Sequence, residues 1–137
     1  LDVTGQLDRV RDATRKLTDA GIAVSLFIDP DPLQVTASRA VGATIIELHT
    51  GDFCDAPTAA IAARELERLR EACEEAHRIG LVVAAGHGID YRNVGSIAAL
   101  PHVEELNIGH SIVCHAVFVG FERAVAEMIA AMAEGAA

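Results

Sequence analysis

The chain has 137 residues, 51% of them hydrophobic, which is enough for one domain with its own core. A formal net charge of −9 argues against nucleic acid or an anionic membrane as a partner, since both require a basic surface. The apolar runs are too short to span a bilayer, which argues against a membrane protein.

The cysteines and the first residue indicate the cellular compartment and whether the chain is part of a longer one. Cys54, Cys73 and Cys114 are widely spaced and form no C-x-x-C pair, so they fit the reducing cytoplasm better than a disulfide framework. No signal peptide is visible, and Leu1 replaces an initiator methionine. We therefore expect a cytoplasmic protein and a piece of a longer chain.

The first predicted helix is followed by a buried strand. Side chains recur at helical spacing, and Gly21 stands where the helix would stop; the recurring positions are Leu7, Val10, Thr14 and Leu17. The run IAVSLFID then predicts a strand over residues 22–29.

A second helix is predicted to begin at Asp31. This residue is placed as the N-cap, Pro32 takes the first helical position, and Gln34 completes an Asp variant of the capping box. The helix is expected to end near Gly42.

The remaining chain continues to alternate strands with helices. The elements expected in order are a strand over 43–50, a helix over 57–79, a strand over 81–86, a short helix between Asn93 and Pro101, a strand over 103–108, and a helical segment over 111–132 interrupted at Gly120. This order predicts a single α/β domain over residues 1–137 with four parallel strands and outer helices. The right-handed crossover rule places the carboxyl ends of all the strands at one edge.

Polar residues and glycines gather at that edge, where α/β folds bind their ligands. The strand ends deliver Asp29 and Pro30; Glu47, His49, Thr50 and Gly51; Gly86, His87 and Gly88; and Asn107, Gly109 and His110. The glycines let a ligand approach the backbone, because no Cβ intervenes.

Glu47 and His87 are the main candidates for chemistry. Glu47 lies in the apolar run TIIELH, where burying an unpaired carboxylate is costly. It is therefore either functional or held in a structural ion pair or a hydrogen-bonded layer inside a barrel. His87 stands between two glycines after an apolar strand, which favours an acid–base role over that of a plain turn residue. His49 alternates with Glu47 and is equally well explained as a strand-end cap.

The segment NIGHSI, residues 107–112, predicts a strand that enters a helix through Gly109. Free N–H groups and the positive end of the helix dipole would suit a phosphate there. The alternative is an ordinary turn between a strand and a helix.

Four motifs resemble those of pyridoxine 5′-phosphate synthase in their order and approximate spacing: SLFIDPDP, IELHTG, AGHGIDYRNV, and ELNIGHSIV with AVFVG. The resemblance runs over essentially the whole chain and corresponds to the C-terminal part of a family that forms a (β/α)8 TIM barrel. It implies a half-barrel, because a complete barrel needs about 250 residues.

The resemblance implies an enzyme of vitamin B6 biosynthesis. The family condenses 3-amino-2-oxopropyl phosphate with 1-deoxy-D-xylulose 5-phosphate to pyridoxine 5′-phosphate, phosphate and water, without a metal or organic cofactor. By motif, Glu47 corresponds to a carboxylate that stabilises the transition state, and His87 to the proton donor. Gly88 corresponds to a substrate contact, and Gly109 with His110 to a phosphate and product site.

The family's N-terminal half carries a Glu base, a catalytic His and further substrate ligands, which this chain does not contain. We therefore expect the isolated chain to be inactive. Two uncovered sheet edges predict a partner, either the N-terminal half or a second copy in a homo-oligomer. The sequence departs from many members at Ala84, where they have Asn, and at Cys114 and His115, where they have Ala and Arg, so substrate contacts there would differ.

Two other functions fit the same residues. Glu47, His49, His87 and His110 could converge on a zinc ion in a metal-dependent hydrolase. The chain could also be a non-catalytic half-barrel that binds phosphate or serves assembly.

Overall fold

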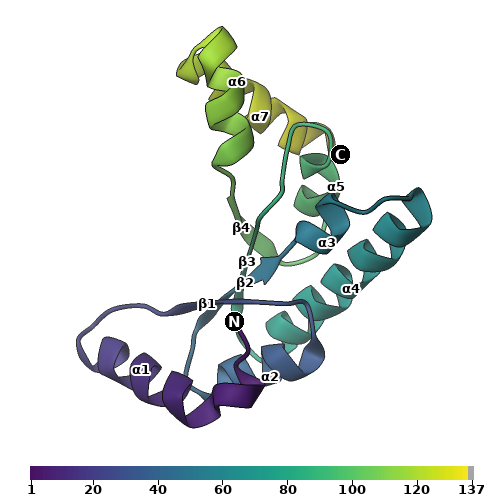
Figure 1. Cartoon of the computed structure of the whole chain (residues 1–137). Helices are drawn as coiled ribbons and strands as arrows, with labels where there is room; N and C mark the ends of the chain where they lie inside the picture. The colour runs from purple at the N-terminus through teal and green to yellow at the C-terminus, as the bar shows by residue number, and fades with distance from the viewer. Residues whose placement is uncertain (136–137) are drawn as a thin grey trace.

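The computed structural model describes residues 1–135, which form an open α/β sheet with helices packed against it (Figure 1). The elements in chain order are η1 (Thr4–Gln6), α1 (Leu7–Asp19), β1 (Ser25–Ile28), α2 (Pro32–Ala40), β2 (Ile45–His49), α3 (Gly51–Cys54), α4 (Ala59–Arg78), β3 (Val82–Gly86), α5 (Val94–Ala98), β4 (Val103–Asn107), α6 (His110–Val119) and α7 (Phe121–Gly135).

The strands of this part of the chain form one sheet in the order β1-β2-β3-β4, and all three pairings are parallel. The predicted α/β half-barrel of four parallel strands with outer helices is thus confirmed within residues 1–135. The predicted domain runs to residue 137, and its last two residues lie outside the described residues. A register shift between Val83 and Ala84 pairs Ala84 with Glu105 and Gly86 with Asn107.

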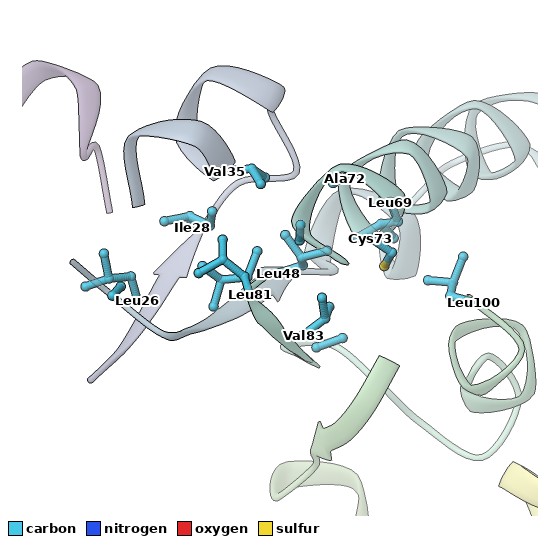
Figure 2. Packing of buried hydrophobic residues seen from close by; sticks show 14 of the residues in the cluster. Leu26, Ile28, Val35, Leu48, Leu69, Ala72, Cys73, Leu81, Val83 and Leu100 are labelled. Carbon is cyan, nitrogen blue, oxygen red and sulfur yellow. The ribbon is translucent and has the colours of Figure 1, made fainter. Parts of the chain in front are cut away.

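The core lies between one face of the sheet and helices α2 and α4. Successive strand residues point to opposite faces, so every second side chain enters this core. Figure 2 shows the strand side chains Leu26, Ile28, Leu48 and Val83 gathered with Val35 of α2 and with Leu69, Ala72 and Cys73 of α4.

The start of α2 confirms one half of the predicted capping box and corrects the other. Asp31 is the N-cap, and its side chain accepts a 2.7 Å hydrogen bond from the Leu33 backbone N–H. Gln34 does not turn back to the cap. Its side-chain oxygen instead accepts a 2.8 Å bond from the Val3 backbone N–H and ties the start of the chain to α2.

Two features differ from those expected, and a third agrees. β1 begins at Ser25 rather than at residue 22, because the Ile22 N–H bonds to the Leu17 carbonyl and closes the end of α1. Residues 51–54 form the short helix α3, which the sequence does not predict. The helical segment after β4 is divided at Gly120, as expected, because that residue adopts a φ of 85°.

The second face of the sheet has no helix over it in the described residues. Phe27 and Val82 lie on this face and remain 40% and 39% exposed. A second apolar surface lies on α6 and α7, which pack on each other next to the end of β4 in Figure 1; there Phe118 is 86% exposed. Within residues 1–135, no helix is long and apolar enough to cross a membrane.

Candidate active site

The carboxyl ends of the strands open into a pocket of about 770 Å³. Its lining comes from the strand ends and from the loops that follow them: Phe27, Glu47, His87, Gly88, Ile89, Asp90, Asn107, Ile108, Gly109, His110 and Ser111. All five residues that the sequence marks for catalysis or substrate binding are in this lining, namely Glu47, His87, Gly88, Gly109 and His110. Parallel strands explain why residues so far apart in the sequence meet at one edge.

Glu47 lies on the uncovered face of β2 and is bound from across the sheet. Its Oε2 accepts a 3.0 Å hydrogen bond from the side-chain amide of Asn107 on β4. Gly86 of β3 lies between them, and a Cβ at this position would collide with Glu47 Oε1. Burial raises the pKa of the Glu47 carboxyl above its usual value; the Asn107 bond opposes this shift, and the charge of Glu105 adds to it.

His87 leaves the end of β3 in a left-handed conformation. Its φ is 85°, and Gly88 continues the turn with a φ of 76°. Positive φ is uncommon for a residue with a side chain. A Cβ on Gly88 would also lie 2.8 Å from the Cβ of Cys54, so glycine is required there for space as well. The turn leaves the His87 side chain exposed and facing the pocket.

The loop after Gly88 is held by hydrogen bonds around Asp90. The Asp90 carboxylate accepts a 2.8 Å bond from the Arg92 backbone N–H and bonds of 2.6 and 2.9 Å from the Arg92 guanidinium. Asn93 donates from its side chain to the Gly88 carbonyl at 3.2 Å. Burial acts to raise the pKa of Asp90, but the bonds from Arg92 outweigh it and hold that pKa below its usual range.

Gly109 and His110 form the start of α6, which also lines the pocket. A Cβ on Gly109 would have no neighbour within 4 Å, so the backbone here is open to a ligand. Ser111 Oγ donates a 2.8 Å bond to the Ile89 carbonyl and joins α6 to the loop that follows β3. The N–H groups of a first helical turn have no partners within the helix, so this end of α6 can attract an anion.

His49 lies beside the pocket rather than in its lining. Its ring stacks on the His87 ring, with centroids 4.6 Å apart and planes inclined by 24°. The Phe27 ring also contacts His49, with ring centroids 5.3 Å apart and planes inclined by 50°. His49 therefore contacts the candidate catalytic residue His87 but does not itself line the pocket.

The other three histidines have partners away from the pocket. His77 and His102 stack on each other with ring centroids 3.7 Å apart. His115 forms a 2.5 Å contact with the Glu127 carboxylate, and its ring meets the edge of Tyr91.

The zinc site considered from the sequence is not assembled. Residues 1–135 contain no group of three or more His, Cys, Asp or Glu side chains arranged to hold a metal ion. His49 turns its ring face toward His87 instead of directing a nitrogen to a common centre with it. The geometry therefore gives no support to the metal-dependent hydrolase.

Several pocket residues are missed by reasoning from the sequence. The sequence marks Asn107 only as a strand end. Its bond to Glu47 depends on the register shift between β3 and β4, which leaves no sequence signal. Phe27 and Ser111 receive no role either. Alternation along SLFI could have found Phe27, because its neighbours Leu26 and Ile28 both enter the core.

Comparisons with known proteins identify close relatives. The family model described as "Pyridoxal phosphate biosynthesis protein PdxJ" matches residues 1–134. A pyridoxine 5′-phosphate synthase of Photobacterium profundum is 55% identical over 128 residues, which cover 93% of this chain and 53% of the relative. The synthase of a Synechococcus species is 54% identical over 132 residues, covering 96% of this chain and 55% of the relative.

The chain thus spans about half the length of the curated relatives it matches. A solved structure gives the same proportion. A chain in the crystal structure of the Amycolatopsis orientalis BexX/CysO complex aligns with a TM-score of 0.66 and 21% identity, covering 98% of this chain and 50% of that one. At this identity the match shows the fold alone: the described part of the chain is similar to half of a larger α/β protein.

Proposed function

The chain belongs to the family of the pyridoxal phosphate biosynthesis protein PdxJ, and from this membership we propose that it is the C-terminal half of a pyridoxine 5′-phosphate synthase. In this proposal it takes part in the condensation of 3-amino-2-oxopropyl phosphate with 1-deoxy-D-xylulose 5-phosphate. The products are pyridoxine 5′-phosphate, inorganic phosphate and water, and the reaction requires no metal or organic cofactor.

One observation carries the proposal. The pocket of about 770 Å³ at the carboxyl edge of the sheet is lined by the Glu47 carboxylate, by the His87 imidazole and by the start of α6 at Gly109. Pockets at this edge are where α/β barrels bind their substrates. The volume falls within the range of small-molecule sites, which supports a substrate of the size of a phosphorylated sugar.

His87 is assigned the role of proton donor. Joining an amine to a ketone and closing a ring expels water, and a departing oxygen leaves more readily when it receives a proton. Imidazole can give and regain a proton near neutral pH. The exposed position of the ring in the pocket supports this role.

Glu47 is assigned the role of stabilising the transition state. A positive charge develops on nitrogen as the amine joins the ketone, and a fixed carboxylate beside it lowers the energy of that state. The hydrogen bond from Asn107 fixes the carboxylate in the direction of the pocket. Partial burial strengthens its field, because less water surrounds the charge.

Gly88, Gly109 and His110 are assigned to substrate and phosphate binding. The overall charge of −9 repels an anion, so a phosphate must be held by local donors. The first N–H groups of α6 and the His110 ring lie at the pocket and can supply these donors. The space beside Gly109 would let a phosphate oxygen approach the backbone.

A partner is part of the proposal. The uncovered sheet face with Phe27 and Val82 requires a covering layer, and the relatives are about twice as long as this chain. We assign that layer to the N-terminal half of the barrel, with homo-oligomer formation by a second copy as the alternative. A cytoplasmic location is also proposed, since Cys54, Cys73 and Cys114 are free thiols.

The direct experiment combines the chain with the N-terminal half of the Photobacterium profundum synthase. Both phosphorylated substrates are supplied, and pyridoxine 5′-phosphate is measured by liquid chromatography. We expect product only when both halves are present. A one-to-one complex that forms no product would contradict a catalytic role and would favour the non-catalytic, phosphate-binding half-barrel.

A further inference from the structure

We propose that residues His49, Thr50 and Gly51, which follow Glu47 in the sequence, form a device that positions His87. The inference rests on the proposed role of His87 as proton donor and adds three positioning residues to it. Each of the three acts on a different part of His87: the backbone, the ring face, and the space behind the ring.

Thr50 holds the backbone of His87. Its side chain is fully buried, and its Oγ lies 2.5 Å from the His87 carbonyl oxygen and 2.9 Å from the Gly86 carbonyl oxygen. The Thr50 backbone N–H also donates to the Gly86 carbonyl at 2.9 Å. The carbonyls on both sides of the His87 Cα are therefore bound by one residue of the neighbouring strand end.

The bonds from Thr50 to these two carbonyls, which we call the Thr50 clamp, act at His87, where the backbone is strained. A left-handed conformation is unfavourable for a residue with a side chain, and it persists only where the surroundings enforce it. His87 has a φ of 85°, and the Thr50 hydroxyl bonds to its own carbonyl. Without that bond, the peptide after His87 could rotate toward a relaxed conformation, and the imidazole would swing with it.

His49 supplies the surface against which the ring lies. The two imidazoles stack at 4.6 Å, and the Phe27 ring also contacts His49, with ring centroids 5.3 Å apart. Because His87 is exposed, this stack is a major restraint on its ring. A stack fixes the plane of a ring while leaving its edge nitrogens free, which suits a group that must donate a proton.

Gly51 makes room for both rings. A Cβ on this buried residue would lie 2.5 Å from Cε1 of His49 and 3.1 Å from Cδ2 of His87. Real Cβ atoms essentially never come as close as 2.5 Å to another heavy atom, so any side chain at residue 51 would displace the His49 ring and crowd the His87 ring. The three consecutive residues thus position His87 in different ways: His49 by its ring, Thr50 by its hydroxyl and Gly51 by the absence of a side chain.

The first test compares Thr50→Val, which removes the hydroxyl at nearly constant volume, with Thr50→Ser, which retains it. Thr14→Val serves as the matched control, because Thr14 is also buried, on α1 and away from the pocket. The readout on the purified chain is the ¹H–¹³C NMR signal of the His87 ring, assigned by its loss in His87→Asn. We expect Thr50→Val to shift this signal and Thr50→Ser and Thr14→Val to leave it in place.

The second test changes His49 instead of the buried Thr50, so it remains informative even if the Thr50→Val variant does not fold. His49→Ala removes the stacked ring, whereas His49→Phe keeps a flat ring. In the complex with the N-terminal half, we expect His49→Ala to lower kcat by roughly 10²-fold, as misplacement of about 1 Å does, with little change in KM. His49→Phe should recover most of that loss.

The inference is overturned if the His87 signal is the same in Thr50→Val as in the parent chain, or if Thr50→Ser disturbs it equally. It is also overturned if His49→Ala and His49→Phe have the same kcat in a complex whose parent form makes product. The NMR arm needs no turnover, so it reports on positioning even when the assembled halves make no product. Failure of the proposed function and failure of this inference are therefore separate results.

Discussion

The side-chain amide of Asn107 donates a 3.0 Å hydrogen bond to Glu47 across the intervening strand β3. The bond passes over Gly86, where a side chain would meet both partners: its Cβ would collide with the Glu47 carboxylate and lie 3.2 Å from the Asn107 Cβ. The Glu47 carboxylate on β2 is therefore held in place by Asn107 on β4, and this bond is possible because Gly86 on β3 has no side chain.

Gly86→Ala is expected to break this relationship. The added methyl group must displace the Glu47 carboxylate and break its bond to Asn107, and loss of one such hydrogen bond costs roughly 0.5–1.5 kcal/mol. Urea denaturation of the purified chain measures the change. Gly86→Ala combined with Glu47→Ala is the control, since removing the displaced side chain should restore part of the loss. Purely additive effects of the two substitutions would contradict the account.

The raised pKa of Glu47 predicts a pH-dependent effect on stability. The folded chain binds the Glu47 proton more tightly than the unfolded chain does. Protonated Glu47 therefore adds to the free energy of unfolding at low pH, and this stabilisation is lost as pH rises through the pKa of the folded state. Glu47→Gln, which cannot ionise, should therefore gain stability relative to the parent chain as pH rises from about 4 to about 7. Denaturation at the two pH values tests the sign.

Glu105→Gln provides the companion measurement for that pH dependence. Removing the Glu105 charge should lower the pKa of Glu47 and reduce the pH dependence of the difference between the parent and Glu47→Gln. A difference that is constant with pH, or that favours the parent chain more strongly at neutral pH, would refute the assignment.

Gly88 and Gly109 should respond differently to alanine. Gly88→Ala places a Cβ at a φ of 76° and 2.8 Å from the Cβ of Cys54, so we expect a loss of about 1–3 kcal/mol in unfolding free energy. Gly109→Ala meets no neighbour and should leave stability unchanged. Its methyl group should instead weaken the binding of inorganic phosphate.

Calorimetric titration with inorganic phosphate and urea denaturation, applied to both glycine variants, separate the two effects. Undiminished phosphate binding by Gly109→Ala would remove the start of α6 from the proposed phosphate site. A Gly88→Ala chain as stable as the parent would show that the turn after β3 relaxes more easily than its contacts indicate.

The exposed face of the sheet predicts association. Phe27 and Val82 are too exposed for a finished barrel interior, so we expect the chain to bind the N-terminal half or to self-associate. Phe27→Ser should weaken binding at the sheet face, while Phe118→Ser on α6 tests the second apolar surface. Light scattering after size-exclusion chromatography gives the masses. A stable monomer that ignores the N-terminal half would contradict the prediction.

The fold and the rim of the pocket follow from the sequence because they depend on local patterns. Alternating helix and strand periodicities give parallel strands, and the crossover rule then brings Glu47, His87 and Gly109 to one edge. The cap at Asp31 is local as well and is found in the structure. None of these inferences needs the exact register of one strand against another.

The contacts that complete the site depend on how neighbouring strands are aligned, and the sequence does not predict this register. The Asn107 bond requires the shift between Val83 and Ala84, and the Thr50 clamp requires that β2 and β3 end level with each other. The error at Gln34 has a similar origin: its local pattern favours a bond to the cap, but the more distant Val3 N–H lies within reach and takes the bond.

The most direct test of the account compares two histidines with similar backbones. His87 and His102 both have positive φ, 85° and 64°, which asparagine tolerates, but His87 follows β3 at the pocket whereas His102 precedes β4 at the opposite end of the sheet. The measurement is the rate of pyridoxine 5′-phosphate formation by each variant in the complex with the N-terminal half. We expect His87→Asn to lose roughly 10²–10⁴-fold in kcat and His102→Asn to retain the parent rate. Equal rates for the two variants would contradict the assignment of His87 as the proton donor.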